Sequence, residues 1–266
     1  MAHVYTEEQN LVDIANAIRE KNGTDNTYAP SEMAGAIRDL KVGELDFEGV
    51  FDQEQAYELN QYYKDGIEYA KEIKEEIDVN AVESFALKFQ TDPKIVFFPQ
   101  VDLSKKTIFS QTFSFSSVIY VDVSSISNNS NVTGMFTYSG IRETFGWLDC
   151  TNMTSLRTLF LASTIHRTKI KNVQNITDFT STFSNCYILQ ECYISGWKMA
   201  SISLSLSKIL SPQSIHYIIQ NAVDVADGAE EGRTLTLHAT AKTNWENSEY
   251  YAEDLAVLKQ KGITIA

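Results

Sequence analysis

Apolar positions recur at a long, regular interval through the middle of the chain. The clearest marker is a phenylalanine that returns after 23 or 24 residues, at Phe113, Phe136, Phe160 and Phe183. Each has an apolar residue four positions before it and a small residue three positions after it. Such a period is typical of proteins in which each coil buries its apolar edge against the next coil. The pattern therefore predicts a solenoid over residues 94–210, with the four rings stacked in its core.

A β-prone segment follows each phenylalanine. Val, Ile and Tyr dominate these segments, and such residues favour extended backbone. The segments occupy residues 118–123, 141–147, 165–170 and 189–194, with 94–103 as an opening strand. Since every coil contributes one segment at the same phase, we expect the segments to form a parallel sheet along one face.

Three copies of the repeat also share an asparagine, eight residues before the phenylalanine. These are Asn128, Asn152 and Asn175, and each begins an Asn-x-Ser/Thr sequon for N-glycosylation. Their fixed phase favours a role within the repeat, because an asparagine amide can bond the backbone groups of a turn. We therefore assign these residues to the solenoid core.

Helical periodicity marks the N-terminal segment, residues 1–45. Two short amphipathic helices are predicted, and their apolar faces contain Leu11, Ile14 and Ile18, and Met33, Ile37 and Leu40. Helices this short cannot bury their faces alone. We expect them to serve in docking or oligomerisation.

A connector, residues 46–93, follows and contains one long helical stretch at 51–77. Its apolar residues lie near coiled-coil spacing, but Gly66 occupies a position where a core residue would be expected. Two interpretations remain open. The helix either packs on the open end of the solenoid or forms a self-associating stalk.

The last segment, residues 211–266, is predicted to be an α/β cap. Ser211 and Pro212 are an N-cap and first helical residue, and a strand follows at 233–239. A second helix ends at Gly262, before a final short strand. The predicted fold class is thus α+β, with an N-terminal helical segment, a short solenoid with a parallel β face, and this cap.

Particular motifs resemble a known repeat family. The stretch "TFSNCYILQECYI" resembles the F-x-x-C-x-x-L turn of BspA-type leucine-rich repeats on bacterial surface proteins. "NITDFTSTF" is similar to the variant in tail proteins of phages that infect Gram-positive bacteria. "LVDIANAIREKNGTDNTYAPSEMAGAI" resembles an N-terminal segment of tail and baseplate proteins of such phages. The resemblance implies a virion protein with a leucine-rich-repeat domain.

The charge is unevenly distributed along the 266 residues. Residues 1–93 hold 21 acidic and 8 basic side chains, which gives all of the net −13, whereas residues 94–266 hold 14 of each. An acidic chain is a poor match for nucleic acid. No apolar run approaches the ~20 residues of a membrane span, so no membrane insertion is expected. The N-terminus lacks the basic-then-apolar pattern of a secretory signal, so we expect synthesis in the host cytoplasm without a signal peptide.

Catalytic chemistry is not indicated by the sequence. The four histidines are scattered, and the cysteines fit small buried residues better than a disulfide framework or zinc site. Asp102 and Asp122 are separated by nearly one period and could face each other as a glycosidase pair, but turn-capping is the simpler role. We predict no enzyme activity and no cofactor or metal.

A ligand-binding surface is indicated by an excess of basic residues over acidic ones in residues 94–208, together with aromatic side chains. Tyr and Trp rings offer flat faces for sugars, and Arg and Lys can meet carboxylates or phosphates. The candidate residues are Tyr120, Arg142, Trp147, Arg167, Lys169 and Trp197. The alternative is that these residues form ordinary solvated faces of the solenoid.

Taken with these patterns, the resemblance implies a tail fibre or baseplate appendage of a phage, located in the virion. Its N-terminus would dock to other virion proteins, and its solenoid would bind an envelope glycan or protein of the bacterium. A homo-oligomer, by analogy a trimer, is expected. The alternatives are a bacterial cell-surface adhesin and a purely structural virion protein without a host receptor.

Overall fold

The structure, a computed structural model, describes residues 53–79, 84–99 and 101–266. The chain divides into two compact units, Met1–Gln61 and Tyr62–Ala266. Of the first unit, only the beginning of helix α3 (Gln53–Val79) is described. The predicted docking residues lie outside the described ranges: Leu11, Ile14, Ile18, Met33, Ile37 and Leu40.

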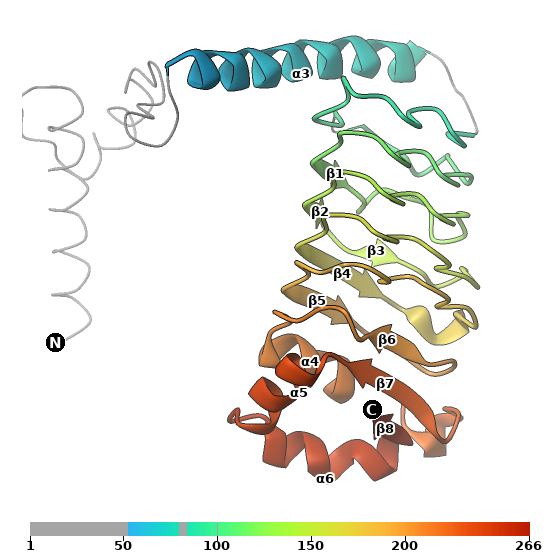
Figure 1. The fold of residues 1–266 in the computed structure, drawn as a ribbon. Coiled ribbons are helices and arrows are strands. Elements are labelled where there is room, and N and C mark those ends of the chain that lie inside the picture. The colour runs from blue at the N-terminus through green and yellow to red at the C-terminus, as the bar shows by residue number, and fades with distance from the viewer. Residues whose placement is uncertain (1–52, 80–83, 100) are drawn as a thin grey trace, which may run out of the picture. The chain divides into compact units, whose positions relative to one another are not determined.

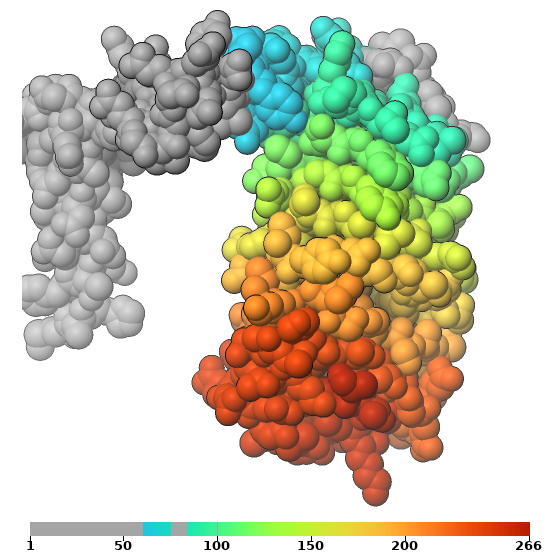
Figure 2. Space-filling view, in the orientation of Figure 1, coloured from blue at the N-terminus to red at the C-terminus, as the bar shows by residue number. Residues whose placement is uncertain are grey.

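Successive turns of the chain are hydrogen-bonded in parallel in the second unit. Isolated parallel bridges join Ser84 to Ile108 and Ile108 to Asn131. Backbone bonds continue the pattern, with the Phe109 amide donating to the Asn131 carbonyl at 2.7 Å. Figure 1 shows the turns one above another, and the colours of Figure 2 follow one another in sequence order along this unit. The pairing starts at Ser84, earlier than the boundary predicted at residue 94.

The predicted combination of helices with a parallel sheet is confirmed. The described part of the chain contains a five-stranded parallel sheet in which β4 pairs with β2, β3 and β5, and β1 pairs with β2. Its strands are β1 (Tyr120–Asp122), β2 (Glu143–Phe145), β3 (Leu148–Asp149), β4 (Arg167–Lys171) and β5 (Glu191–Ile194). The expected opening strand at 94–103 is reduced to a single bridge between Phe97 and Tyr120.

The repeated phenylalanines are buried and stacked as their spacing predicts. Their exposed fractions are 1–2%, and the centroids of consecutive rings lie 5.5–5.8 Å apart. Phe89 extends the column at the N-terminal end, with its ring stacked 5.6 Å from that of Phe113. Burial of each ring contributes about 1.5–3 kcal/mol of hydrophobic free energy. The column is the core of this part of the protein.

The small residue after Phe113 and after Phe136 makes the same hydrogen bond in both turns. The Ser116 hydroxyl donates to the Phe113 carbonyl at 2.8 Å, and the Ser139 hydroxyl donates to that of Phe136 at 2.9 Å. Each of these carbonyls also accepts the backbone amide of the same serine at 3.2 Å, so the hydroxyl is a second donor to it. In the next two turns the Ser163 hydroxyl has no such bond, and the Cys186 thiol donates to the Phe160 carbonyl.

The turns use left-handed backbone at two positions each. One series is Leu87, Gln111, Gly134, Thr158 and Ser181, and the other is Thr91, Phe115, Tyr138, Ala162 and Asn185. A non-glycine residue in this region costs roughly 1–2 kcal/mol. The conformation directs amides to the next turn: the Gln111 amide donates to Thr133 and the Phe115 amide to Thr137, at 3.0 and 2.9 Å. These bonds between turns offset the backbone strain.

The asparagines do not belong to the core, which corrects our assignment. Asn128 is half-buried, and Asn152 and Asn175 are exposed. The Asn152 amide donates to the Asn128 side-chain oxygen at 3.0 Å, and the Asn175 amide donates to the Thr151 carbonyl at 2.7 Å. The asparagines bond between turns at the surface, because the interior at this phase is occupied by apolar side chains.

Residues Tyr62–Val79 of α3 cover the first turn of the stack. Ile73 is buried, and the Tyr69 hydroxyl donates to Asp92 at 2.7 Å. A methyl group added at Gly66 would lie 2.8 Å from the Val96 Cβ, so glycine allows the helix to approach the turn closely. The structure thus favours packing on the open end over a coiled-coil stalk, and Gly66 is part of the contact.

The C-terminal region adds a second parallel sheet and three helices. The sheet has the order β6 (Ile202–Leu204), β7 (Arg233–Leu237), β8 (Ile263–Ile265). The helices are α4 (Pro212–Gln220), α5 (Ala239–Glu246) and α6 (Tyr251–Lys261), with short 3-10 helices at Val173–Asn175 and Val225–Asp227. The Ser211 side chain caps α4 as predicted, whereas α5 was not predicted. Its N-cap is His238, which accepts a bond from the Thr240 amide at 3.0 Å.

Candidate binding surface on the parallel sheet

The outer face of the five-stranded sheet is defined by the alternation of side chains along its strands. Val121, Thr144, Thr168 and Cys192 form one row across the strands and are all buried. The hydroxyls of Thr144 and Thr168 lie 3.0 Å apart in this row. Because successive side chains in a strand point to opposite faces, the residues on either side of this row point outward.

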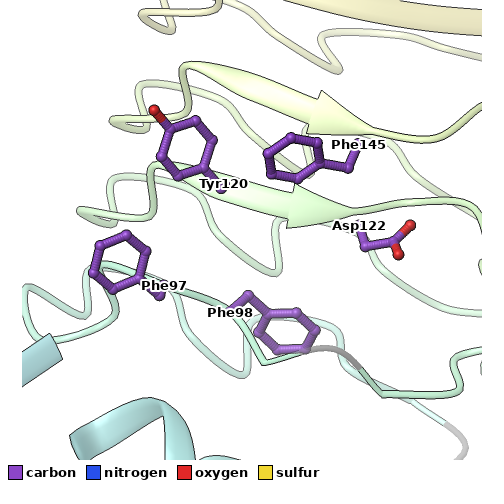
Figure 3. Close-up of a pocket in the computed structure, with 5 residues that line it drawn as sticks. All are labelled: Phe97, Phe98, Tyr120, Asp122 and Phe145. Atoms are coloured by element: carbon purple, nitrogen blue, oxygen red, sulfur yellow. The ribbon is translucent and has the colours of Figure 1, made fainter. Parts of the chain in front are cut away.

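A pocket of about 380 Å³ lies on this outer face. It is lined by four aromatic rings and one carboxylate: Phe97, Phe98, Tyr120, Phe145 and Asp122. Figure 3 shows Phe97 and Tyr120 at one end, Asp122 at the other, and Phe98 and Phe145 between them. Of these five residues, only Tyr120 was among the predicted binding residues.

Phe97, Tyr120 and Phe145 form a column of rings on consecutive turns. The Phe97 and Tyr120 rings are stacked with centroids 6.4 Å apart, and the Tyr120 and Phe145 rings are tilted at 5.5 Å. Tyr120 is 37% exposed and Phe145 is 48% exposed. Cross-strand aromatic pairs stabilise a sheet, but rings this exposed also leave area for a ligand.

Phe98 forms the deeper part of the pocket. Its ring packs edge-on against Phe113 and Phe89, with centroids 5.0 and 5.7 Å away, so it is anchored in the core column. A pocket wall that is fixed by core packing keeps its shape before a ligand arrives, which lowers the ordering cost of binding.

Asp122 supplies the polar group of the pocket. Its Oδ1 accepts bonds from the Ser124 amide at 2.9 Å and the Ser124 hydroxyl at 2.6 Å. Gly146, on the next turn, has a φ of +72°, and an added methyl would lie 2.5 Å from the Ser124 Cβ. Because residue 146 is glycine, the backbone that joins Phe145 to Trp147 can pass close to Asp122 and Ser124.

A second aromatic cluster lies on the same outer face, near β5 and α4. The Tyr217 ring contacts those of Trp147 and Tyr193, with centroids 6.0 and 5.2 Å away. Tyr193 is in β5 and faces outward, between the buried residues Cys192 and Ile194. The side chain of Tyr217 thus extends from α4 over the end of the sheet.

Basic side chains lie between the two aromatic groups. Arg167 and Lys169 are exposed on β4, and Arg142 is exposed just before β2. The Arg167 guanidinium pairs with Glu191 at 3.2 Å. Lys169 stands beside Tyr193 in the strand register and has no carboxylate partner within 4.0 Å among the residues that the structure describes.

Of the six predicted ligand-binding residues, Tyr120, Arg167 and Lys169 point outward from the sheet, and Trp147 contacts the Tyr217 ring over it. Arg142 is exposed but precedes Glu143, so strand alternation does not place it on this face, and Trp197 does not share the face either. Trp197 is fully buried and donates from Nε1 to the Ala200 carbonyl at 2.9 Å, with the Arg233 guanidinium 4.9 Å from its ring. Trp197 is a core residue, because the C-terminal region covers it. Our assignment of Trp197 to a ligand surface is wrong.

The acids of the repeat serve as turn caps, as the simpler reading of Asp102 and Asp122 predicts. Asp102 accepts from the Ser104 amide at 2.9 Å, as Asp122 does from Ser124. The pKa of Asp102 is lowered, first by the bonds from Ser104. At Asp178 the bonds from Thr180 lower the pKa in the same way. A lowered pKa at Asp102 and Asp178 does not suit a general acid.

The cysteines match the prediction of small buried residues. Cys150, Cys186 and Cys192 are free and buried. Burial raises the pKa of the Cys186 thiol to about 12. Burial also raises the pKa of the other two thiols. Within the described ranges, no group of three or more His, Cys, Asp or Glu side chains is placed to hold a metal ion.

None of the helices that the structure describes combines the length and the apolar character needed to cross a membrane.

Sequence reasoning missed most of the pocket and of the second cluster. Phe97 and Phe145 lie one turn before and one turn after Tyr120, so the repeat period itself was a usable signal for them. Tyr193 follows from strand alternation in β5. Tyr217 could not be found this way, because its position depends on how α4 packs beside β5.

Compared with protein-family models, curated proteins and solved structures, the chain matches none of them.

Proposed function

We propose that this chain is a receptor-binding component of a phage tail, a tail fibre or baseplate appendage. In this proposal its residues 84–210 are a leucine-rich-repeat solenoid of the BspA type. The N-terminal segment docks to other virion proteins, and the outer face of the five-stranded sheet binds an envelope glycan of the bacterial host. The repeat and N-terminal motifs support the virion assignment.

The repeat class is supported by geometry that extends beyond the sequence motifs. Arg167 pairs with Glu191 and Tyr120 with Glu143, each with a partner about one period away. The stacked rings of Phe113 and Phe136 follow the same period. A stack in which each turn contacts its neighbours presents an extended and rigid face.

The observation that carries the binding function is the pocket beside Tyr120. The aromatic walls provide flat area on which a sugar ring can stack, and the single carboxylate can accept hydrogen bonds from the sugar hydroxyls. The two sides of the pocket are preformed, since Phe98 packs in the core and Asp122 is bonded to Ser124. Binding, with no chemical turnover, is the function that this arrangement supports.

Weak individual sites are sufficient for such a protein. A homo-oligomer, with a trimer as our proposal, places several copies of the pocket on one particle. Linked sites multiply affinity without any new contact. Moderate affinity at each pocket is therefore compatible with firm attachment of the particle.

The test is binding of the full-length protein to Gram-positive cells and to their purified wall polymers. We expect saturable binding that Tyr120→Ala weakens by roughly tenfold, as for an aromatic contact worth about 1.4 kcal/mol. Tyr138→Ala is the matched control. Tyr138 is 51% exposed and stacks on Phe115 in a turn away from the sheet face, so its loss should leave binding unchanged.

Three outcomes would replace the proposal. Absence of saturable binding at micromolar protein would favour a purely structural virion role. Equal binding by the Tyr120→Ala and Tyr138→Ala variants would place the receptor site elsewhere. Release of reducing sugar from the polymer would identify an enzyme. Immunogold labelling of tail tips would separate a virion component from a bacterial surface adhesin.

A further inference from the structure

We infer that the sheet face binds a linear acidic oligosaccharide, whose chain crosses the strands from the Tyr120 pocket to the Trp147–Tyr193–Tyr217 cluster. This inference rests on the proposed function and specifies its ligand. Two aromatic subsites lie on one face, and a basic strand lies between them. The sequence grouped Tyr120, Trp147 and Lys169 as candidate ligand residues but did not give their order across the sheet.

The direction of the ligand follows from the strand order. Tyr120 and Phe145 are on β1 and β2, Lys169 is on β4, and Tyr193 is on β5. Neighbouring strands are about 4.8 Å apart, so β1 and β5 are separated by roughly 14 Å. A single sugar ring cannot contact both Tyr120 on β1 and Tyr193 on β5, whereas an extended oligosaccharide can.

The acidic character of the ligand follows from the charges between the subsites. Lys169 has no ion-pair partner within the described part of the chain, and Arg167 is engaged on one side only, through its Nε and Glu191. A carboxylate or phosphate on the ligand would meet Lys169 as it passes from one ring cluster to the other. A neutral glycan would leave this contact unused.

Single-stranded nucleic acid also combines rings with phosphates, but the pocket disfavours it. The polar group beside Tyr120 is the Asp122 carboxylate, and Glu143 lies next to Tyr120 in the register. Nucleic acid carries a phosphate at every base and needs a basic groove along its whole length. The face offers its cations in the middle only.

The experiment uses an array of bacterial envelope polymers that holds each acidic polymer beside its neutral backbone, in fragments of graded length. Full-length protein and four variants are titrated at low and high salt: Trp147→Ala, Lys169→Gln, Tyr187→Ala and Lys105→Gln. Tyr187 and Lys105 are exposed in turns outside the sheet face and serve as matched controls. A single-stranded oligonucleotide is included as a competing ligand.

We expect the acidic fragments to bind more tightly than the neutral ones, and affinity to rise with length until both subsites are filled. Lys169→Gln should weaken acidic binding by roughly tenfold and leave neutral binding unchanged. Trp147→Ala should weaken the binding of long fragments while sparing short ones. The control variants should behave as wild type.

Each contrary result has a distinct meaning. Equal affinity for neutral and acidic fragments, or binding that saturates with one sugar, overturns this inference and leaves the proposed function intact. Tighter binding of the oligonucleotide also overturns it. If no envelope polymer binds at all, the proposed function fails together with the inference.

Discussion

Two parts of the chain differ in the polar side chains that they bury. We call residues 84–210 the repeated part and residues 211–266 the closing part. Apart from Lys106, the buried polar side chains that the structure describes in the repeated part are all serine or threonine hydroxyls. The closing part instead buries three charged residues, Arg233, Asp254 and Lys261, at 2%, 0% and 9% exposure. The two parts differ in how the buried backbone groups obtain their hydrogen-bond partners.

Within the stack, the next turn supplies the partners for the backbone of the turn before it. The last turns have no such successor, so donors must come from long side chains. The Arg233 guanidinium donates to the carbonyls of Trp197, Val223 and Lys261, and the Lys261 ammonium donates to the Ala222 carbonyl at 2.7 Å. Repetition can thus rely on backbone bonds between turns, whereas termination requires unique contacts that no other position can replace.

The buried carboxylate of Asp254 fits the same account. It accepts bonds from His216 Nδ1, Gln220 Nε2 and Trp245 Nε1, at 2.8, 2.8 and 2.7 Å. These donors come from α4 and α5, so one side chain of α6 ties three helices together. A buried charge is tolerated only when it is this fully hydrogen-bonded.

The largest expected effect comes from Arg233→Met, which removes the donor of three carbonyl groups at once. The Trp197 carbonyl keeps the Val223 amide as a donor, whereas the loss of the side-chain donor to the Val223 and Lys261 carbonyls costs about 1–3 kcal/mol each. The contact of Arg233 with the Trp197 ring is lost as well, so the free energy of unfolding should fall by about 5 kcal/mol. Trp197 and Trp245 lie in this region, and their fluorescence during urea denaturation reports its unfolding. The closing part should unfold at lower urea than the stack.

The Arg233→Lys variant is measured beside Arg233→Met. Lysine keeps the positive charge but cannot donate to several carbonyls in the planar geometry of a guanidinium, so the stability of this variant should lie between that of Arg233→Met and the wild type. If both variants unfold at the wild-type urea midpoint, the unique donors do not stabilise the closing part. The comparison between the two parts would then lose its basis.

Much of the repeated part could be predicted because the same sequence pattern recurs in every turn, and each recurrence supports the assignment of the others. Phe113 and Phe183 could be assigned to the core since Phe136 and Phe160 showed the same neighbours. Phe89 could have been found by the same count. It was missed because the segment around it was assigned to the preceding helical connector.

The binding face could be predicted only in part. Tyr120 and Lys169 follow from strand alternation, but alternation does not say which outward rings remain uncovered. Trp197 is buried because Arg233, far away in the sequence, packs over it, and Tyr217 reaches the sheet because α4 packs beside β5. The exposure of such side chains depends on contacts between segments that are distant in the sequence, and a local sequence pattern does not predict these contacts.

Phe136→Ala gives the next largest effect and tests the repeated part. Phe136 stacks between Phe113 and Phe160 at 5.6 and 5.5 Å, so truncation leaves a cavity in the column and should cost about 3–5 kcal/mol. Because the environments repeat, Phe113→Ala and Phe160→Ala should cost the same within about 1 kcal/mol. Chemical denaturation of the three variants provides the comparison.

Phe115→Ala is the control for this series, because Phe115 is 55% exposed. Its ring stacks on Tyr138 at the surface, so its loss should change the free energy of unfolding by only about 1 kcal/mol. Widely different costs among the three core variants would mean that the turns are not equivalent. Equivalence of the turns is the property that separates this part from the closing part.

A smaller effect is expected for the serine hydroxyls of the stack. Ser116→Ala and Ser139→Ala each remove one buried donor to a phenylalanine carbonyl, at 2.8 and 2.9 Å in the wild type. Each should cost about 1 kcal/mol, and the double variant about twice as much. Each carbonyl also accepts the amide of the same serine at 3.2 Å, and measured values near zero would show that this amide bond is sufficient. The contrast with the Arg233 variants would then be larger than we infer.

The smallest effect concerns the surface carboxylates of the stack and their response to acid. Burial alone would raise the pKa of Asp149, but hydrogen bonds from Thr151 and Asn172 and the charge of Lys171 outweigh it, so the pKa lies below its usual value. A carboxylate with a lowered folded-state pKa stabilises the fold above its unfolded pKa, and this stabilisation is lost as the pH falls through the folded value. Between about pH 5 and pH 2, Asp149→Asn should therefore lose less stability than the wild type, by about 0.5–1 kcal/mol.

Urea midpoints measured across this pH range test the prediction. Parallel curves for the two proteins would contradict it and would assign the acid response of the stack to other carboxylates.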